Sequence, residues 1–556
     1  MSAVLGVSCH YHEAAAALVV DGEIRAAIAE ERLSRVKHDP SLPRRAIRAV
    51  LDLGGVTGPE LDAVVYHEDP YAKIERILVY GLGAFPHSIR QLPRALASQL
   101  SGKLWVLDAL AREVGVPRAR VLHRTHHESH AASAFFTSPF DEACVLTVDG
   151  VGESTTTALW HGRGDTLTRV ESLELPHSLG LLYAAITAWC GFEVNGGEYK
   201  VMGLAAFGEP RFREAFERLI TLHPDGSFSL DARPFGRFLH PTRGYGRGLE
   251  DLLGPARAPR RPWDLDRDDD RRRADVAATL QQVVEEALLG LCRRARDQVG
   301  APDLCLAGGV ALNCVANDRI QRESGFDRVF VHPAAGDAGG ALGAAILGAV
   351  DLGDPRPGGF TPFLGVAPDA GRAADVARHL GLSVREVSDA DAAIVERLGR
   401  GQVIARCSGR SEWGPRALGN RSLLADPRDS ETRERINRDV KGREAFRPFA
   451  PAVPAGLLPD LVDGEADLLT AHMTTVRRVR PGAPLAAATH VDGTARIQSV
   501  QPVDPLGGIV GAFGPVLNTS LNAAGDAMVG RETDALSFLL RHPVDALYVQ
   551  DVEITR

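Results

Sequence analysis

The sequence is poor in lysine, in long apolar runs and in paired cysteines. Only five of its 63 basic residues are lysine, and arginine supplies the others. No run approaches the ~20 apolar residues that a membrane span needs. The N-terminal apolar stretch is interrupted by His and Glu and has no basic segment before it, which argues against a signal peptide. The seven scattered cysteines include no CxxC pair and indicate reduced thiols, so we expect a cytoplasmic protein outside the membrane.

The charge balance excludes a further class of protein. A net charge of -9 argues against a nucleic-acid binder, which would present a basic face. The 44% hydrophobic and 24% charged residues are typical of a soluble globular protein, and 556 residues suffice for two to four domains. The scarcity of lysine makes each one informative, because an ammonium and a guanidinium differ in geometry and pKa. This hint is weak for Lys73 and Lys103, which lie in ordinary helical surroundings.

A unit of strand, turn, strand and strand occurs twice, first as AVLGVSC, AAAALVVDG and EIRAAIAEER and again over residues 143–174. Asp21-Gly22 between two apolar runs is a strong hairpin signal. Internal repeats take priority in interpreting a sequence. A duplicated unit followed each time by helices describes the two lobes of the actin-like ATPase fold, whose first hairpins point at a shared nucleotide and metal cleft. The alternative is two unrelated hairpins in an α/β protein.

Further along the chain, periodicity separates helices from strands. RRRADVAATLQQVVEEALLGLCRRARDQVG has apolar residues every three or four positions and predicts a long amphipathic helix, with DRDDDRRR as its solvated start. LCLAGGVALNCVAN and VFVHPAAGDAGGALGAAILGA each predict a buried strand, a turn and a helix. GDPRPGG (353–359) is typical of a linker. We therefore predict an actin-like domain over 1–352 and a second α/β domain over 360–556.

The segment HRTHHESHAASAFF suggests a metal site. His126 and His130 are four residues apart, so on a helix both imidazoles share one face. The spacing alone is weak evidence, but the small residues that follow permit close helix packing. Asp149 stands at the end of the repeated strand, and Asp337 supplies another carboxylate at a strand-to-helix turn. A mixture of imidazole and carboxylate suits Fe(II), Zn or Mn better than a site for Mg alone.

Two further groups predict anion binding. Gly308-Gly309 open a helix whose N-terminal amides could hold phosphate, although neither this turn nor the one at Asp337 is a Walker loop. The C-terminal part has cations among Gly, Pro and Ser, as an oligo-anion pocket requires: Arg416, Arg421, Lys441, Arg443, Arg447 and Arg496. Solvated loops in an arginine-rich protein would explain any one of these residues, but not the rare lysine among them. NTSLN (518–522) adds small polar donors.

These motifs resemble those of the O-carbamoyltransferase family of nodulation-factor and antibiotic biosynthesis. The matching segments are in order and span residue 4 to about 535: EERLSRVKHD, HHESHAASAFF, VDGVGE, EYKVMGLAAFGEP, AGGVALNCVAN, GDAGGALGAA, GRSEWGPRALGNRS, VKGREAFRPFAP, HVDGTARIQSV and NTSLN. The resemblance implies an N-terminal lobe pair like the threonylcarbamoyl-transferring proteins of the actin-like fold. It also implies a C-terminal, YrdC-like domain that forms carbamoyl-adenylate from carbamoyl phosphate and ATP, and transfer of the carbamoyl group to a small-molecule alcohol.

The resemblance also implies roles for individual residues. The metal ligands would be His126, His130, Asp149 and Asp337. Lys441 and Arg496 would be catalytic in activation, and the following residues would contact the nucleotide or carbamoyl phosphate: Lys37, Lys200, Gly308, Gly309, Asn313, Arg416, Arg421, Ser422, Arg443, Arg447, Asn518 and Ser520. His12 is a candidate general base for the acceptor hydroxyl, because imidazole titrates near working pH, or a structural residue capping its turn. The family usually continues with Asp-Ser, whereas this chain has Glu13-Ala14.

Two other functions remain open. A sugar-kinase-like phosphotransferase would use the same lobes without needing His126 and His130 or the second cationic domain. A non-catalytic nucleotide-binding regulator would keep the cleft. The acceptor is expected to be an antibiotic or its precursor rather than a nodulation factor, since the Arg- and Ala-rich composition suits a GC-rich bacterial genome. The oligomeric state cannot be inferred from the sequence.

Overall fold

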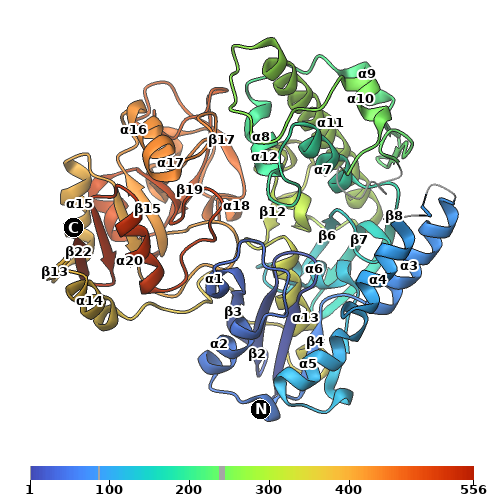
Figure 1. Cartoon of the computed structure of the whole chain (residues 1–556), viewed down its shortest axis with the longest axis horizontal. Coiled ribbons are helices and arrows are strands. Elements are labelled where there is room, and N and C mark those ends of the chain that lie inside the picture. The colour runs from blue at the N-terminus through green and yellow to red at the C-terminus, as the bar shows by residue number, and fades with distance from the viewer. Residues whose placement is uncertain (1, 86–87, 90, 237–243) are drawn as a thin grey trace. The chain divides into compact units, whose positions relative to one another are not determined.

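The computed structural model describes residues 2–85, 88–89, 91–236 and 244–556 and divides into two compact units. The first unit comprises residues 1–25 and 40–360, and the second comprises residues 26–39 and 361–556. Figure 1 traces the chain through both units. Segment 26–39, which begins within strand β3 (Glu23–Ala29), is thus grouped with the second unit although β3 pairs in a sheet of the first.

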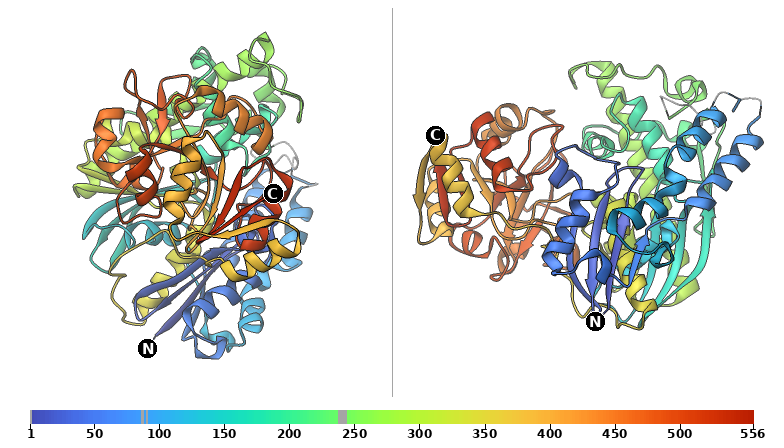
Figure 2. Two further views of the ribbon diagram at one scale, coloured as in Figure 1. Left: turned by 90° about the vertical axis from the view of Figure 1, so that its left-hand side faces the viewer. Right: turned by 60° about the horizontal axis from the view of Figure 1, so that its bottom comes forward.

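The first unit contains two sheets, of which the N-terminal one has the order β3-β2-β1-β4-β5. Its strands are β1 (Ala3–Ser8), β2 (Ala15–Val20), β3 (Glu23–Ala29), β4 (Ala63–Tyr66) and β5 (Val121–His123). β1 pairs antiparallel with β2 and parallel with β4, and β4 pairs parallel with β5. The predicted turn joins β2 to β3 with positive φ at both Asp21 and Gly22, as a type I′ hairpin requires. Figure 2 shows these blue strands side by side from two further directions.

The other sheet of this unit has the order β12-β11-β6-β7-β8. Its strands are β6 (Glu142–Val148), β7 (Thr155–Arg163), β8 (Thr166–Glu174), β11 (Asp303–Ala307) and β12 (Arg328–Val331). β6 pairs antiparallel with β7 and parallel with β11, just as β1 pairs with β2 and β4. The two sheets thus share one strand order and one pattern of directions. The duplication predicted from the sequence is confirmed.

Two buried helices bring the sheets of this unit together. α13 (Asp337–Asp351) packs on β1, β2 and β4 and against α6 (His126–Phe135). A Cβ at Gly343 would lie 1.8 Å from the Ser129 carbonyl oxygen, and one at Gly6 would lie 1.9 Å from the Ala341 carbonyl oxygen. Only glycine permits this approach of helix to helix and of strand to helix. The close packing expected from the small residues after His130 is confirmed.

The long helix α11 (Asp268–Val299) is confirmed, and its charged start is exposed as expected except at two residues. Asp270 and Arg273 in the DRDDDRRR run are buried, not solvated. The Asp270 carboxylate lies 2.9 Å from the Arg257 guanidinium, which itself stacks 3.9 Å from the Trp263 ring. The sequence of the run alone does not reveal this ion pair, because Arg257 lies outside the run. α8 (Glu198–Ala205), α7 (Leu179–Trp189) and α12 (Cys314–Glu323) pack along this helix.

The second unit is built on an eight-stranded mixed sheet of order β13-β22-β21-β14-β15-β20-β16-β19. Its strands are β13 (Ser383–Glu386), β14 (Ile404–Cys407), β15 (Arg421–Ala425), β16 (Ala450–Pro454), β19 (Gln498–Val500), β20 (Val516–Ser520), β21 (Ala546–Val549) and β22 (Val552–Thr555). Alternate residues such as Ile404 and Ala405 enter different hydrophobic clusters. One cluster includes α14 (Ala370–His379) and α20 (Glu532–Arg541), and the other includes α15 (Ala390–Gly399) and α19 (Gly507–Phe513). Helices therefore cover both faces of the sheet, and the expected mixed α/β class is confirmed.

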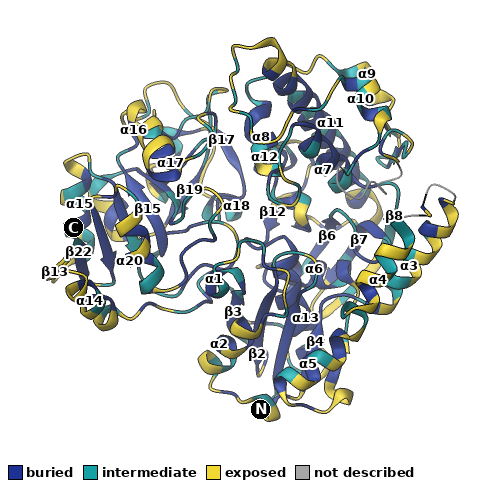
Figure 3. Cartoon of the chain, viewed as in Figure 1, coloured by how far each residue is buried: buried dark blue, intermediate teal, exposed yellow. Residues whose placement is uncertain are grey.

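Burial follows this layering in both units. Figure 3 colours the sheet strands mainly dark blue, whereas exposed residues gather on outer helices such as α3 (Pro70–Gly83) and α14. All seven cysteines are buried and unpaired, as expected for reduced thiols. Within the described part of the chain, no helix is both long enough and apolar enough to span a membrane.

Candidate functional site

The first candidate site is built on helix α6. Thr125 and Glu128 form a capping box that starts this helix at His126. His126 and His130 consequently lie one turn apart on one face, and their Nε2 atoms are 3.0 Å from each other. The helix expected at this histidine pair is confirmed.

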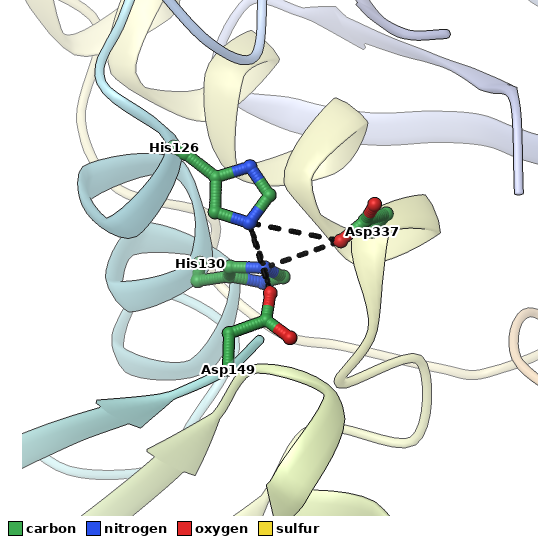
Figure 4. Close-up of side chains that lie close together, drawn as sticks. All are labelled: His126, His130, Asp149 and Asp337. Atoms are coloured by element: carbon green, nitrogen blue, oxygen red, sulfur yellow. Dashed lines mark hydrogen bonds and ion pairs between the residues drawn. The ribbon is translucent and has the colours of Figure 1, made fainter. Parts of the chain in front are cut away.

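Two carboxylates reach the same point from other elements. Asp149 directly follows strand β6, and Asp337 is the first residue of helix α13. Asp149 Oδ2 lies 2.9 Å from Nε2 of His126 and 3.1 Å from Nε2 of His130. Asp337 Oδ1 lies 3.7 and 3.6 Å from the same two atoms. Figure 4 shows the convergence of these four side chains, which we call the metal cluster.

The electrostatics of the metal cluster are those of strongly interacting buried groups. Burial alone would lower the pKa of His130, but its hydrogen bonds to Asp149 and Asp337 raise that pKa to about 9. Burial alone would also raise the pKa of Asp149, yet hydrogen bonds from both histidines hold it well below its usual value. The pKa of Asp337 is likewise lowered against burial, by the charges of His12 and of the histidine pair. Both carboxylates are therefore anionic.

This donor set fits a divalent cation. The four residues offer two imidazole nitrogens and two carboxylate oxygens that all lie within 4.8 Å of one another. The second oxygen of Asp337 is buried and accepts no hydrogen bond from the described residues; its nearest charged neighbour is His12, 3.7 Å away, so this oxygen could also contact a bound cation. Imidazole and carboxylate together suit Fe(II), Zn or Mn.

The glycine turn after β11 supports Asp149. Gly308 has φ +89°, and a Cβ there would lie 2.2 Å from the Val148 carbonyl oxygen. The N–H of Gly309 donates to Asp149 Oδ1 at 3.2 Å, and the N–H of Gly150 donates to the same oxygen at 2.7 Å. The turn thus orients a candidate metal ligand, and phosphate binding by Gly308 and Gly309 stays a prediction.

His127 is the neighbour that the cluster leaves out. Its Nδ1 lies 2.8 Å from Thr147 Oγ1, and its Nε2 lies 3.0 Å from the Thr155 carbonyl oxygen. Burial, reinforced by the charges of His126 and His130, lowers its pKa to about 3. His127 is therefore a neutral side chain that ties α6 to β6 and the start of β7.

Glu153 is a residue to which the sequence analysis gave no role. One of its carboxylate oxygens accepts the backbone N–H of His126 at 2.9 Å and that of Asp69 at 2.8 Å. This buried carboxylate therefore fixes the start of α6 to the loop that follows Asp149. Glu153 closes the VDGVGE motif, so its position was visible, but the two backbone donors that it accepts from were not.

The other sites predicted in this unit are dispersed. His12 Nε2 lies 3.7 Å from Asp337 Oδ2; burial would lower the His12 pKa, but the Asp337 charge raises it. Lys200 lies on α8 with its ammonium 5.4 Å from the centre of the Phe192 ring. Asn313 caps α12 and exchanges two 3.0 Å hydrogen bonds with Gln281. Of these three residues, His12 is the one that borders the metal cluster.

The second unit contains a buried lysine surrounded by positive charge. Lys441 is 3% exposed, and its ammonium donates to the carbonyl oxygens of Ser520 and Asn522. It also reaches the Asn522 side-chain oxygen at 3.2 Å. Burial lowers the Lys441 pKa well below its usual value, and three further cations add to the shift: Arg443, Arg447 and Lys37. We call these four residues the cation cluster.

The cation cluster fits an anion. A lysine that is buried among carbonyl oxygens and near three like charges is costly unless an anion compensates it. Arg443 donates to Asn437 Oδ1 at 2.6 Å, and Arg447 forms a 3.7 Å ion pair with Glu444. Lys37 reaches this region because segment 26–39 belongs to the second unit. Nearby on the sheet, Ser422 faces Ser520 across the β15–β20 pair.

Arg421 has a different environment from the cation cluster. It is fully buried, and among the described residues its guanidinium donates only to backbone carbonyl oxygens: those of Ser408, Gly409, Asn420, Val366 and Gly530. Such an arginine ties loops together, and this geometry does not favour its predicted role in anion binding. By contrast, the described residues offer no hydrogen-bond partner to Ser422 Oγ or Asn518 Oδ1, although both atoms are buried.

The remaining two predicted arginines lie outside regular strands of the main sheet. Arg416 is half-buried in the loop between β14 and β15. Arg496 lies opposite Val476 in the two-stranded β17 (Val476–Arg478) and β18 (Thr494–Arg496) sheet. Their roles stay predictions.

Comparison with known sequences identifies the family. Residues 3–346 match the carbamoyltransferase N-terminus, and residues 395–556 match the carbamoyltransferase C-terminus. An uncharacterized Synechocystis protein, sll1178, is 38% identical over 100% of this chain and 97% of its own length. Nodulation protein NolNO of Sinorhizobium fredii is 35% identical over 97% and 78%, and the 3'-hydroxymethylcephem-O-carbamoyltransferase of Amycolatopsis lactamdurans is 28% identical over 97% of each chain. The chain belongs to the carbamoyltransferase family.

Proposed function

We propose that this protein is an ATP-dependent O-carbamoyltransferase that activates a carbamoyl group in the second unit and transfers it to an alcohol in the first. The match to both the N-terminal and the C-terminal carbamoyltransferase regions carries the proposal. The two clusters support the division, because one gathers carboxylates and imidazoles and the other gathers cations. A site for a cation and a site for anions serve different half-reactions.

Activation belongs to the cation cluster. Water hydrolyses carbamoyl phosphate to carbamate and inorganic phosphate, and a carbamate oxygen then attacks the α-phosphorus of ATP. Pyrophosphate leaves, and carbamoyl-adenylate forms. Lys441, Arg443 and Arg447 neutralise charge on the phosphates. Arg496 is assigned to the same step by the family resemblance. Ser422, Asn518 and Ser520 supply hydrogen bonds to the co-substrates.

Transfer belongs to the metal cluster. A divalent ion bound by the four ligands would act as a Lewis acid for the carbamoyl carbonyl or the nucleotide phosphate. His12 accepts the proton of the acceptor hydroxyl at Nε2, since it borders Asp337 at 3.7 Å. The alcohol oxygen then bonds to the carbamoyl carbon, and AMP leaves. His12→Asn is expected to slow transfer about 100-fold without reducing pyrophosphate release; equal loss of both would count against this role.

The fold proposed for each part follows from its topology. The shared strand order of the two N-terminal sheets supports actin-like lobes over 1–352. In these lobes, the proposed contacts to a nucleotide are Lys200, Gly308, Gly309 and Asn313. The eight-stranded sheet with helices on both faces supports a YrdC-like adenylate-forming domain over 360–556. Segment 26–39 brings Lys37 to the latter.

The acceptor is proposed to be a hydroxylated natural product, an antibiotic or its precursor. One relative is named for a hydroxymethylcephem and another for nodulation, so relatives of this chain differ in acceptor. Screening hydroxylated natural products by mass for the gain of a carbamoyl group tests this assignment. Carbamoyl transfer to oligosaccharides alone would contradict it.

The reaction itself is tested with ATP and carbamoyl phosphate. We expect pyrophosphate release that requires both compounds, and AMP release that rises with an acceptor. A sugar kinase would instead produce ADP from an acceptor without carbamoyl phosphate, and a nucleotide-binding regulator would release neither product. ADP formation independent of carbamoyl phosphate would overturn the proposal.

A further inference from the structure

The outward face of helix α3 is apolar, although this helix lies at the surface of the first unit (Figure 3). The side chains exposed on this face follow the spacing of one helical face: Tyr71, Glu75, Leu78, Val79 and Leu82. Glu75 is the one charged residue among them. The outer helix α2 (Arg44–Gly54) instead exposes three arginines in its first five residues. An amphipathic helix normally turns its charged side to the solvent, so the outward face of α3 requires an explanation.

The apolar surface continues on the elements that pack against α3. Both α4 (Gln91–Leu100) and the short helix η2 (Lys103–Trp105) contact α3. A Cβ at Gly81 would lie 2.4 Å from Leu92 Cδ1, so α3 and α4 approach each other closely. The exposed large apolar side chains that follow Leu82 as far as η2 are Phe85, Ile89, Leu100 and Trp105. We call these four and the four apolar residues on α3 the apolar patch.

The apolar patch is as large as one side of a protein–protein interface. Its eight side chains are each about half-exposed and together present on the order of 800 Å². The largest apolar patch on a typical monomer is about 300–600 Å². Each partner of a stable complex buries about 800 Å². The patch therefore suffices for a stable dimer without any further surface.

The charges beside the apolar patch complement those of a second copy of this chain. Within α3 and α4, Glu75 and Arg94 are the exposed charged residues, and neither side chain forms a hydrogen bond or ion pair with the described residues. In a dimer with a two-fold axis, residue i of one copy meets residue j of the other and j meets i. One acid and one base per copy can thus form two ion pairs. A membrane-binding helix would instead carry a basic rim beside its apolar face.

The inward side of α3 holds the loop that follows Asp149. Arg76 Nη1 donates to the Gly152 carbonyl oxygen at 2.7 Å. Gly152 packs closely on a candidate metal ligand, since a Cβ there would lie 2.8 Å from the Cβ of His126. A contact that fixes α3 from outside therefore also fixes a loop of the metal cluster.

We propose that the apolar patch is the interface of a two-fold homodimer, with Glu75 of each copy opposite the partner's Arg94. Dimerisation covers the outward face of α3 and holds its inward side against the loop that follows Asp149. The dimer goes beyond the proposed carbamoyl transfer and does not depend on it.

Sedimentation velocity of the full chain tests the dimer. We expect a dimer at micromolar concentration and a monomer in Leu82→Glu, because the new carboxylate would be buried in an apolar contact. Leu352→Glu is the matched control: Leu352 is 50% exposed in the first unit but lies outside the apolar patch, so this variant should remain dimeric. Leu82 is itself 64% exposed, and circular dichroism checks that its substitution leaves the fold intact. A dimer as stable in Leu82→Glu as in the control would overturn the proposal, and so would a monomeric wild type, whether or not it sediments with anionic lipid vesicles.

Charge reversal tests the two-fold arrangement without touching an apolar residue. Glu75→Arg and Arg94→Glu should each weaken the dimer about tenfold, because each variant places like charges opposite one another twice. The double variant should restore the dissociation constant to within about threefold of the wild type, because the two substitutions are coupled. A double variant no tighter than the single ones would overturn the pairing of these two residues.

Calorimetric titration with Mn²⁺ tests the link between the dimer and the metal cluster. Monomeric Leu82→Glu should bind Mn²⁺ about tenfold more weakly than dimeric Leu352→Glu, because the loop that packs on His126 is less constrained. Equal affinities would overturn this link. Neither ATP nor carbamoyl phosphate is present, so a failure here is distinct from a failure of the proposed reaction.

Discussion

The metal cluster and the cation cluster gather opposite charges by opposite means. In the first unit, two carboxylates and two imidazoles project from the ends of a strand and two helices and share hydrogen bonds. In the second unit, Lys441 lies among carbonyl oxygens; Arg443 and Arg447 come from the loop that follows it, and Lys37 comes from segment 26–39. One site has excess negative charge and the other excess positive charge. The comparison teaches that the charge of each cluster supports a different ligand, a cation in the first unit and an anion in the second.

Removing the charge of Lys441 should have the largest effect on this comparison. Lys441→Met is expected to lower pyrophosphate release from ATP and carbamoyl phosphate about 1,000-fold, because charge on the departing phosphates is no longer neutralised. Arg438→Met removes an exposed cation three residues away, which pairs only with its neighbour Asp439, and should retain activity. Similar rates in both variants would show that the cation cluster is not the activation site.

Variants of two neighbouring histidines test which side chains of α6 bind the metal. His130→Ala should weaken Mn²⁺ or Zn²⁺ binding more than about 100-fold, because it removes a ligand rather than a supporting group. His127→Asn should keep metal affinity and instead lose stability, since His127 bonds to Thr147 and the Thr155 carbonyl. Calorimetric titration of the metal-free protein measures both. Loss of metal binding in His127→Asn alone would reverse the assignment.

Arg421 separates a structural cation from the cation cluster. Arg421→Met leaves several buried carbonyl oxygens without donors and should cost on the order of 3 kcal/mol of unfolding free energy. Arg378→Met, on an exposed face of α14, should change stability by less than about 0.5 kcal/mol. Denaturant unfolding measures the difference. If Arg421→Met kept its stability but had a raised KM for ATP, Arg421 would be a binding residue rather than a structural one.

Each unit holds a buried carboxylate with a strongly lowered pKa, Asp149 in the first and Glu553 in the second. Glu553 tests how such a group makes stability depend on pH. Burial would raise the pKa of Glu553, but hydrogen bonds from Arg397, Arg385 and Tyr548 lower it to about 2. A lowered pKa stabilises the fold above the unfolded pKa near 4.3, and this contribution is lost as pH falls toward 2. Glu553→Gln should therefore lose on the order of 2 kcal/mol at pH 7, and its deficit should narrow below pH 4. A deficit independent of pH would contradict this linkage.

The smallest effect is expected from the support of α6. Glu153→Gln keeps the size of the side chain but weakens its hydrogen bonds from the backbone N–H groups of His126 and Asp69. Metal affinity should fall about tenfold, with the metal-to-protein ratio unchanged. A drop below one bound metal would make Glu153 a ligand, and unchanged affinity would leave it a purely structural residue.

The sequence predicted the candidate site best where its side chains lie on helices or at the end of a strand. The helix that carries His126 and His130, the strand end at Asp149 and the helix start at Asp337 follow from periodicity and from the repeated unit. Once those elements pack as a duplicated fold, the four side chains have little freedom. Periodicity and the repeated unit therefore predicted a shared place for His126, His130 and Asp149, whereas the family resemblance added Asp337 as the fourth candidate ligand.

Loop residues and buried partners were beyond the same reasoning. Arg421 and Lys441 look alike in sequence, yet one binds carbonyl oxygens with all its donors and the other lies near three cations. The sequence predicted a solvated Asp270, but the structure pairs it with Arg257. Lys73 likewise looked unremarkable in the sequence, but it forms a buried ion pair with Glu68. In each case the decisive contact is non-local. A pattern within one segment cannot reveal it.

The division of labour between the two units is tested most directly in the His126→Ala/His130→Ala double variant. It is mixed with ATP, carbamoyl phosphate and an acceptor, and carbamoyl-adenylate, pyrophosphate and carbamoylated alcohol are measured after rapid quenching. We predict continued pyrophosphate release, accumulation of carbamoyl-adenylate and no carbamoylated alcohol. Carbamoylated alcohol at the wild-type rate, or loss of pyrophosphate release in a folded variant, would contradict the account.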